Sequence, residues 1–195
     1  TIAHSMAFFK DCIYVGVTNP AGAGPEDCPR ILRYHPKIKK WEEVYRSPLV
    51  KPDARSNARD IQVSSHTTQL GNLLQRKKRT YDSVSRDRGY RSMVVFKGKS
   101  DKEPALYVAT LSPWGSLFLR SEDGERFAVV SEPGLGNSEI LSFRGLTVHA
   151  GKLFASPAGT TNDDFMDRNF SPEATIYVSA DPATGQWQHA VAPNF

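Results

Sequence analysis

Apolar and polar residues alternate along three separate stretches of the chain, and each stretch then passes through a tight turn into a second apolar run. The stretches are 2–16, 90–109 and 143–155, with Asp or Gly at the turn. Alternation with a period of two, interrupted by residues that favour turns, is typical of a β-hairpin. The pattern therefore predicts one hairpin in each stretch.

A second half follows each hairpin and has the same layout in all three copies. It consists of a strand, a polar turn built on Asp, Gly or Pro, and an aromatic residue that opens a fourth strand. The three aromatic residues are Trp41, Phe127 and Trp187. Four short strands repeated about every 45–55 residues are typical of a β-propeller blade. The sequence thus predicts an all-β fold of about three four-stranded blades, with these aromatic residues packed between neighbouring blades.

Two of the polar turns carry a sequence motif. Residues 121–127 and 179–187 resemble the Asp-box of bacterial-neuraminidase-type repeats, which runs Ser-x-Asp-x-Gly-x-Thr-Trp, although one copy is a residue shorter and the other a residue longer. The turn at 34–41 is more similar to the kelch version. Both families are propellers, so the resemblance implies that fold for everything except 51–88. The Asp-box is a structural turn in its family and implies no catalytic residue here.

The repeat divides the predicted propeller domain into blades at 1–50, 89–135 and 136–195, with an insert at 51–88. Three blades leave a propeller open, which exposes apolar faces that neighbouring repeats would cover. We therefore expect missing blades, a second copy of the chain or another protein partner to complete the ring. Two copies would close a six-blade ring by two-fold symmetry.

The insert is strongly basic. It holds nine Lys or Arg residues against four acidic ones, an excess of five positive charges, whereas the whole chain carries +4. Its densest run is Arg76, Lys77, Lys78 and Arg79. This run suits contact with a phosphate or an acidic protein, but no aromatic residue interleaves it, so nucleic acid is not the partner we expect. We expect 53–84 to be the least regular part of the chain.

Two arginines and a histidine occupy equivalent places in the first strand of each unit. They are His4, Arg91 and Arg144. The first strand of a blade lines the central channel, so these side chains are expected to bind a carboxylate, phosphate or sulfate. Pairing of each arginine with a nearby carboxylate or carbonyl is the structural alternative. Trp114 lies in a loop expected near the channel rim, where it would suit sugar or peptide stacking.

The same arginines raise the possibility of an enzyme. Sialidases hold the substrate carboxylate with three arginines, and Arg91 and Arg144 would supply two of them. The Arg-Ile-Pro motif of that family is absent, however, and no Tyr–Glu pair can be assigned. We therefore expect a non-catalytic ligand-binding or protein-binding scaffold. The alternatives are a glycan-processing, sialidase-like hydrolase and a subunit of a larger complex that is anchored by the basic insert.

The remaining candidate chemistry is sparse. Asp163, Asp164 and Asp167 could ligate Ca²⁺ in a loop, but the Asp-x-Asp-x-Asp-Gly pattern is missing, so neither a metal nor another cofactor is expected. If 12–18 and 29–35 form a hairpin, Cys12 lies at its open end and Cys28 near its tip, on the order of 20 Å apart, so the two are not expected to form a disulfide. No apolar run reaches the roughly 18–20 residues of a membrane span.

Overall fold

The computed structural model describes residues 2–19, 24–53, 81–160 and 175–190, and within these ranges the chain contains strands and short 3-10 helices but no α-helix. A first sheet has four antiparallel strands, each paired with the next in sequence. They are β1 (Ile2–Phe9), β2 (Cys12–Thr18), β3 (Arg30–His35) and β4 (Lys40–Arg46). The all-β prediction is confirmed.

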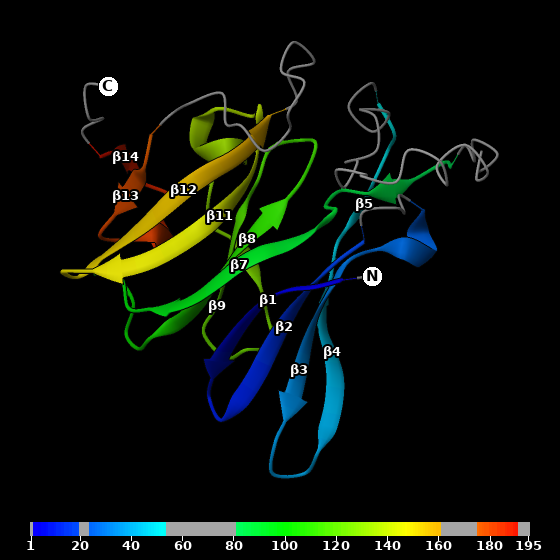
Figure 1. Cartoon of the computed structure of the whole chain (residues 1–195), viewed down its shortest axis with the longest axis horizontal. Coiled ribbons are helices and arrows are strands. Elements are labelled where there is room, and N and C mark those ends of the chain that lie inside the picture. Colours follow the sequence, from blue (N-terminus) through cyan, green and yellow to red (C-terminus); the bar gives the residue numbers. More distant parts are fainter. Residues whose placement is uncertain (1, 20–23, 54–80, 161–174, 191–195) are drawn as a thin grey trace, which may run out of the picture.

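A second, larger sheet has eight strands and curls around its long axis (Figure 1). Its first half is β7 (Gly89–Phe96), β8 (Ala105–Leu111), β9 (Phe118–Ser121) and β10 (Ala128–Val129). Its second half is β11 (Ile140–His149), β12 (Lys152–Thr160), β13 (Tyr177–Ser179) and β14 (Gln188–His189). Consecutive strands pair within each half, and the pairing of Ser142 with Leu111 joins the halves. The described residues therefore form three four-stranded antiparallel units.

The first strands of the three units lie next to one another. β1 contacts β7, and β7 contacts β11, as Figure 1 shows. Buried residues of the first two units form one core, which contains Tyr14, Ile31, Tyr90, Leu106 and Leu119. Buried residues of the last two units form another, which contains Phe118, Ile140, Phe143 and Tyr177. Removal of this apolar surface from water holds the units together.

The aromatic residues that open the fourth strands differ in their surroundings. Phe127 packs against Tyr45 of the first unit, with ring centroids 5.4 Å apart. Trp187 stacks on Phe118 of the second unit at 4.7 Å. Both therefore pack between units as predicted. Trp41 is 55% exposed, because within the described chain no unit precedes the first sheet and covers its side, so the packing of Trp41 between units stays a prediction.

The turn that follows β9 is held by its own side chains. The Ser121 hydroxyl accepts a hydrogen bond from the amide of Gly124 at 2.8 Å, and Asp123 accepts from the amides of Glu125 and Arg126 at 2.8 Å each. These amide donors lower the pKa of Asp123. Gly124 has φ +80°, and a Cβ there would meet the Tyr14 hydroxyl at 1.9 Å, so only glycine fits.

The two ends of the insert are held side by side. β5 (Leu49–Val50) pairs with β6 (Val84–Ser85) in a short antiparallel ladder. Next to it, buried Asp87 accepts from Arg86 at 2.6 Å and from the Ser47 hydroxyl at 3.2 Å. Residues 54–80, which include the Arg76–Arg79 run and most of the segment expected to be irregular, lie outside the described residues.

Two further expectations concern the cysteines and membranes. Cys12 and Cys28 are both free thiols, which confirms that they do not pair with each other. In the part of the chain that the structure describes, no helix is both long enough and apolar enough to cross a membrane.

Candidate anion-binding site

The first strand of each unit is interrupted at the same place. The pairing register shifts between Ala3 and Ser5 in β1, between Tyr90 and Ser92 in β7, and between Phe143 and Gly145 in β11. The residue at each interruption is, in turn, His4, Arg91 and Arg144. A β-bulge leaves one residue out of the ladder and redirects its side chain. The three cations predicted from the repeat thus share a local backbone feature as well as a sequence position.

In the first and second units, the residue after the bulge forms a hydrogen bond to the next unit. The Ser5 hydroxyl donates to the carbonyl of Tyr90 at 2.8 Å, and the Ser92 hydroxyl donates to the carbonyl of Phe143 at 2.7 Å. Each acceptor carbonyl immediately precedes the bulged cation of the following unit. These two hydrogen bonds fix the spacing between neighbouring bulges, and so they position the cations relative to one another.

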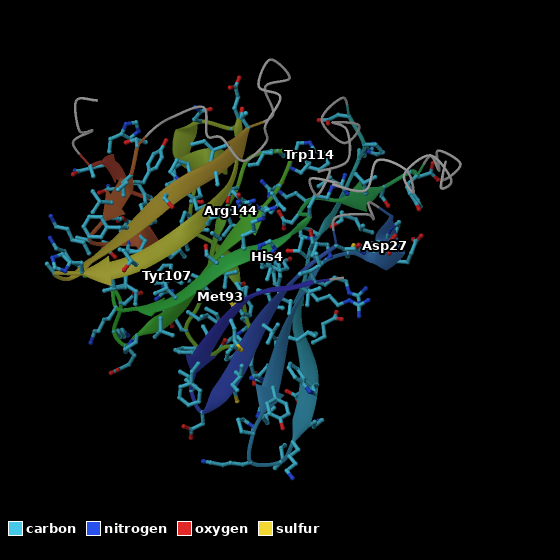
Figure 2. The ribbon with its side chains drawn as sticks, viewed as in Figure 1. His4, Asp27, Met93, Tyr107, Trp114 and Arg144 are labelled. Carbon is cyan, nitrogen blue, oxygen red and sulfur yellow. The ribbon has the colours of Figure 1, made fainter. Side chains whose placement is uncertain are left out.

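The bulges bring the cations close enough to influence one another. The pKa of His4 lies below 6.5, because of desolvation by the surrounding protein and then because of the charges of Arg91 and Arg144. Burial, followed by the charge of Arg144, lowers the pKa of Arg91 to about 10. His4 and Arg144 lie near each other in Figure 2, and β7 runs between their strands. The structure therefore brings together the three residues that the repeat predicted.

Arg91 and Arg144 bring positive charge to this site. In the described part of the chain, the charged groups that shift the pKa values of His4 and Arg91 are other cations, with no carboxylate among them. The Nε atom of Arg91 is buried without a hydrogen-bond partner. The Nδ1 atom of His4 lies 3.2 Å from the Thr18 hydroxyl. Guanidinium and imidazole N–H groups can donate hydrogen bonds to the oxygens of an anion.

Comparison with protein-family models finds no match for the chain, and comparison with curated proteins finds no relative. The assignment of chemistry to the cation cluster, defined as His4, Arg91 and Arg144, therefore depends on the geometry of this chain.

Trp114, the fourth predicted ligand-binding residue, has a defined contact of its own. Its indole N–H donates to the carboxylate of Asp53 at 3.0 Å, and its backbone amide donates to the Ser112 hydroxyl at 3.2 Å. The side chain is half-buried. It joins the loop after β8 to the segment that follows β5, so its indole N–H supports the position of that loop.

Metal binding has no support in the described ranges. They contain no group of three or more His, Cys, Asp or Glu side chains arranged to hold a metal ion. Asp163, Asp164 and Asp167, the residues considered for Ca²⁺, lie outside the described residues.

The sequence analysis missed the two serines that follow the bulged cations. Their signal was available, because a serine follows the cationic residue in two of the three copies and a glycine in the third. A hydroxyl that recurs at one strand position suggests a recurring hydrogen bond. Its acceptor, a carbonyl in the neighbouring unit, could be found only after the units were placed.

Proposed function

We propose that the chain forms three blades of a β-propeller, and that the cation cluster in these blades is a binding site. Three features support the propeller. The three units are antiparallel meanders of four strands, their first strands lie side by side, and aromatic residues from two of their fourth strands pack against the preceding unit. In a propeller the first strands line the central channel, so the cation cluster would face a ligand that enters it.

The proposed ligand is an anion, a small molecule or a group on a glycan or protein partner, that carries a carboxylate, phosphate or sulfate. The observation that carries this proposal is the equivalent placement of three basic side chains at three bulges, each within electrostatic reach of another. The positive charges of Arg91 and Arg144 would attract such an anion.

His4 makes the proposed binding dependent on pH. Its lowered pKa keeps the imidazole neutral at neutral pH. A bound anion favours the charged imidazolium, so binding and protonation reinforce each other. The affinity for an anion should therefore rise as the pH falls through the range in which His4 titrates.

Isothermal titration calorimetry with citrate and with inorganic phosphate tests the proposal, at about pH 7.5 and at about pH 6. Arg91→Gln should weaken binding about tenfold or more, as expected for loss of a charge-assisted hydrogen bond. Arg126→Gln removes one exposed arginine that pairs with Asp123 and serves as the matched control. Equal affinities for the wild type and for Arg91→Gln would contradict the site.

A sialidase-like hydrolase would need a carboxylate pair beside these cations. Among the described residues, the groups that perturb the pKa values of His4 and Arg91 include no carboxylate. Binding without hydrolysis is therefore the function that we propose for the cluster.

A further inference from the structure

A second group of reactive side chains lies in the first sheet, away from the cation cluster. Cys12 begins β2, His35 ends β3 and Glu42 lies in β4. The Sγ atom of Cys12 is 3.2 Å from Nδ1 of His35, and Nε2 of the same ring is 3.0 Å from Oε2 of Glu42. A thiol, an imidazole and a carboxylate thus follow one another at hydrogen-bonding distances. This is the order in which a nucleophile, its base and the group that orients the base are arranged.

Glu42 sets the position of the proton on the imidazole. Hydrogen bonds from Arg33, His35 and Lys40 lower the pKa of Glu42 to about 2, so the side chain is a carboxylate at neutral pH. A carboxylate can only accept, and Nε2 of His35 must therefore carry the proton that it donates. In a neutral imidazole the other nitrogen, Nδ1, is then unprotonated. That nitrogen faces the thiol and can take its proton.

The thiol borders a cavity of about 330 Å³. Cys12 is only 7% exposed, so a reagent would reach Sγ through this cavity. Lys10, Arg33 and Lys37 also line it, together with Asp123 and with Asp11, which pairs with Lys37 at 3.3 Å. A positive charge at the wall, such as that of Lys10, would stabilise a carbonyl oxygen as it gains negative charge on nucleophilic attack.

The repeat provides an internal comparison. The strand registers align the three units residue by residue. By this alignment, Cys12 corresponds to Ala105 in the second unit and Lys152 in the third. His35 corresponds to Glu122 and Ala180 in the same two units. Glu42 corresponds to Ala128 and Gln188. The neighbouring pair of Tyr14 and Arg33, in contrast, recurs as Tyr107 and Arg120 in the second unit. The meander folds without the thiol, imidazole and carboxylate, so their meeting in the first unit is not a requirement of the fold.

We propose that Cys12, His35 and Glu42 form a nucleophilic thiol site that takes an acyl group from a small ester or thioester in the cavity. The Sγ atom attacks the carbonyl carbon while Nδ1 of His35 removes the thiol proton. The bond from that carbon to the leaving oxygen or sulfur breaks, and His35 returns the proton to the leaving group. Cys12 then carries the acyl group as a thioester, which water hydrolyses to release the acid. Glu42 is a positioning residue, which acts through the His35 ring.

The test uses the full chain and p-nitrophenyl acetate, with release of p-nitrophenolate followed by absorbance and the acetylated residue identified by peptide mass spectrometry. We expect an acetyl group on Cys12 and none on Cys28. Cys28 is the matched thiol, because it is 5% exposed and therefore as buried as Cys12. Cys12→Ser should abolish the rapid release, and Cys28→Ser should leave it unchanged. Equal labelling of both cysteines, or none on Cys12, would overturn the proposal.

Two further variants separate the chemistry from folding. His35→Gln should slow acetylation of Cys12 about 100-fold, the effect of losing a general base. Glu42→Gln places an amide donor opposite Nε2, which drives the ring proton to Nδ1, and should both slow acetylation and change its pH profile. Glu43→Gln alters the adjacent carboxylate, which pairs with Arg46 instead, and should match the wild type. All variants are compared by thermal melting. Acetylation that is unchanged in folded His35→Gln would contradict the proposal.

Discussion

At the scale of single residues, the cation cluster shows what a repeat in the sequence can and cannot predict. His4, Arg91 and Arg144 could be singled out because they align across three units. Their proximity depends on three bulges and on hydrogen bonds from Ser5 and Ser92 to carbonyls of the neighbouring units, and these acceptors could not be located before the units were placed. The equivalence of the residues was predictable, whereas the electrostatic coupling between them was not.

The coupling leads to a prediction for the titration of His4. Arg91→Gln removes one of the charges that lower the pKa of His4, so this pKa should rise toward 6.5. Proton NMR of the imidazole resonances across a pH series measures it. An unchanged His4 pKa in the variant would show that the charge of Arg91 does not contribute to the shift.

The lowered pKa of His4 also determines the direction in which the stability of the folded chain changes with pH. His4 binds a proton less readily in the folded chain than in the unfolded chain, because its folded pKa lies below 6.5. The contribution of His4 to stability is therefore complete above about pH 6.5 and is lost as the pH falls toward the folded pKa.

The thiol site could not be predicted from the sequence, for a different reason. It is formed by Cys12, His35 and Glu42. The residues are spread over three strands and belong to no spaced motif. The predicted hairpin placed Cys12 level with the end of the next strand, which is where His35 lies. The contribution of Glu42 required the register of β3 against β4, in which Arg33 pairs with Glu42.

At the scale of elements, the strands and their order were predictable because alternation and turn residues specify a meander locally. The surroundings of the fourth strands were not predictable. Trp41 and Trp187 have equivalent places in the sequence, yet Trp187 stacks on Phe118 and Trp41 is 55% exposed. Sequence periodicity identifies a residue that can pack between units but does not tell whether a neighbouring unit covers it.

This difference predicts unequal costs of two similar substitutions. Trp187→Ala removes a stacked pair between units and should lower the free energy of unfolding by about 2–3 kcal/mol. Trp41→Ala changes an exposed side chain that contacts Tyr34 and should cost about 0.5 kcal/mol. Urea denaturation followed by circular dichroism compares them. A large cost for Trp41→Ala would indicate that the exposed face of the first sheet is covered in solution.

At the scale of the whole molecule, three units leave one sheet face with exposed apolar residues, including Met6 at 69% and Phe8 at 66%. Light scattering on size-exclusion peaks measures whether a second copy covers them. If two chains complete one ring, the particle mass should be twice 21.7 kDa. A stable monomer at all concentrations tested would exclude closure by self-association and would leave missing blades or another protein partner to complete the ring.

The short ladder between β5 and β6 has a consequence for how the chain tolerates changes in length. Val50 and Val84 are paired neighbours, so the two ends of the segment between them are held close together. Lengthening or shortening this segment does not move its two ends apart, and the entropy of closing it varies only slowly with length. The position between the first and second units is therefore a natural place to graft a foreign sequence, since the ladder keeps the flanking strands in register whatever lies between them.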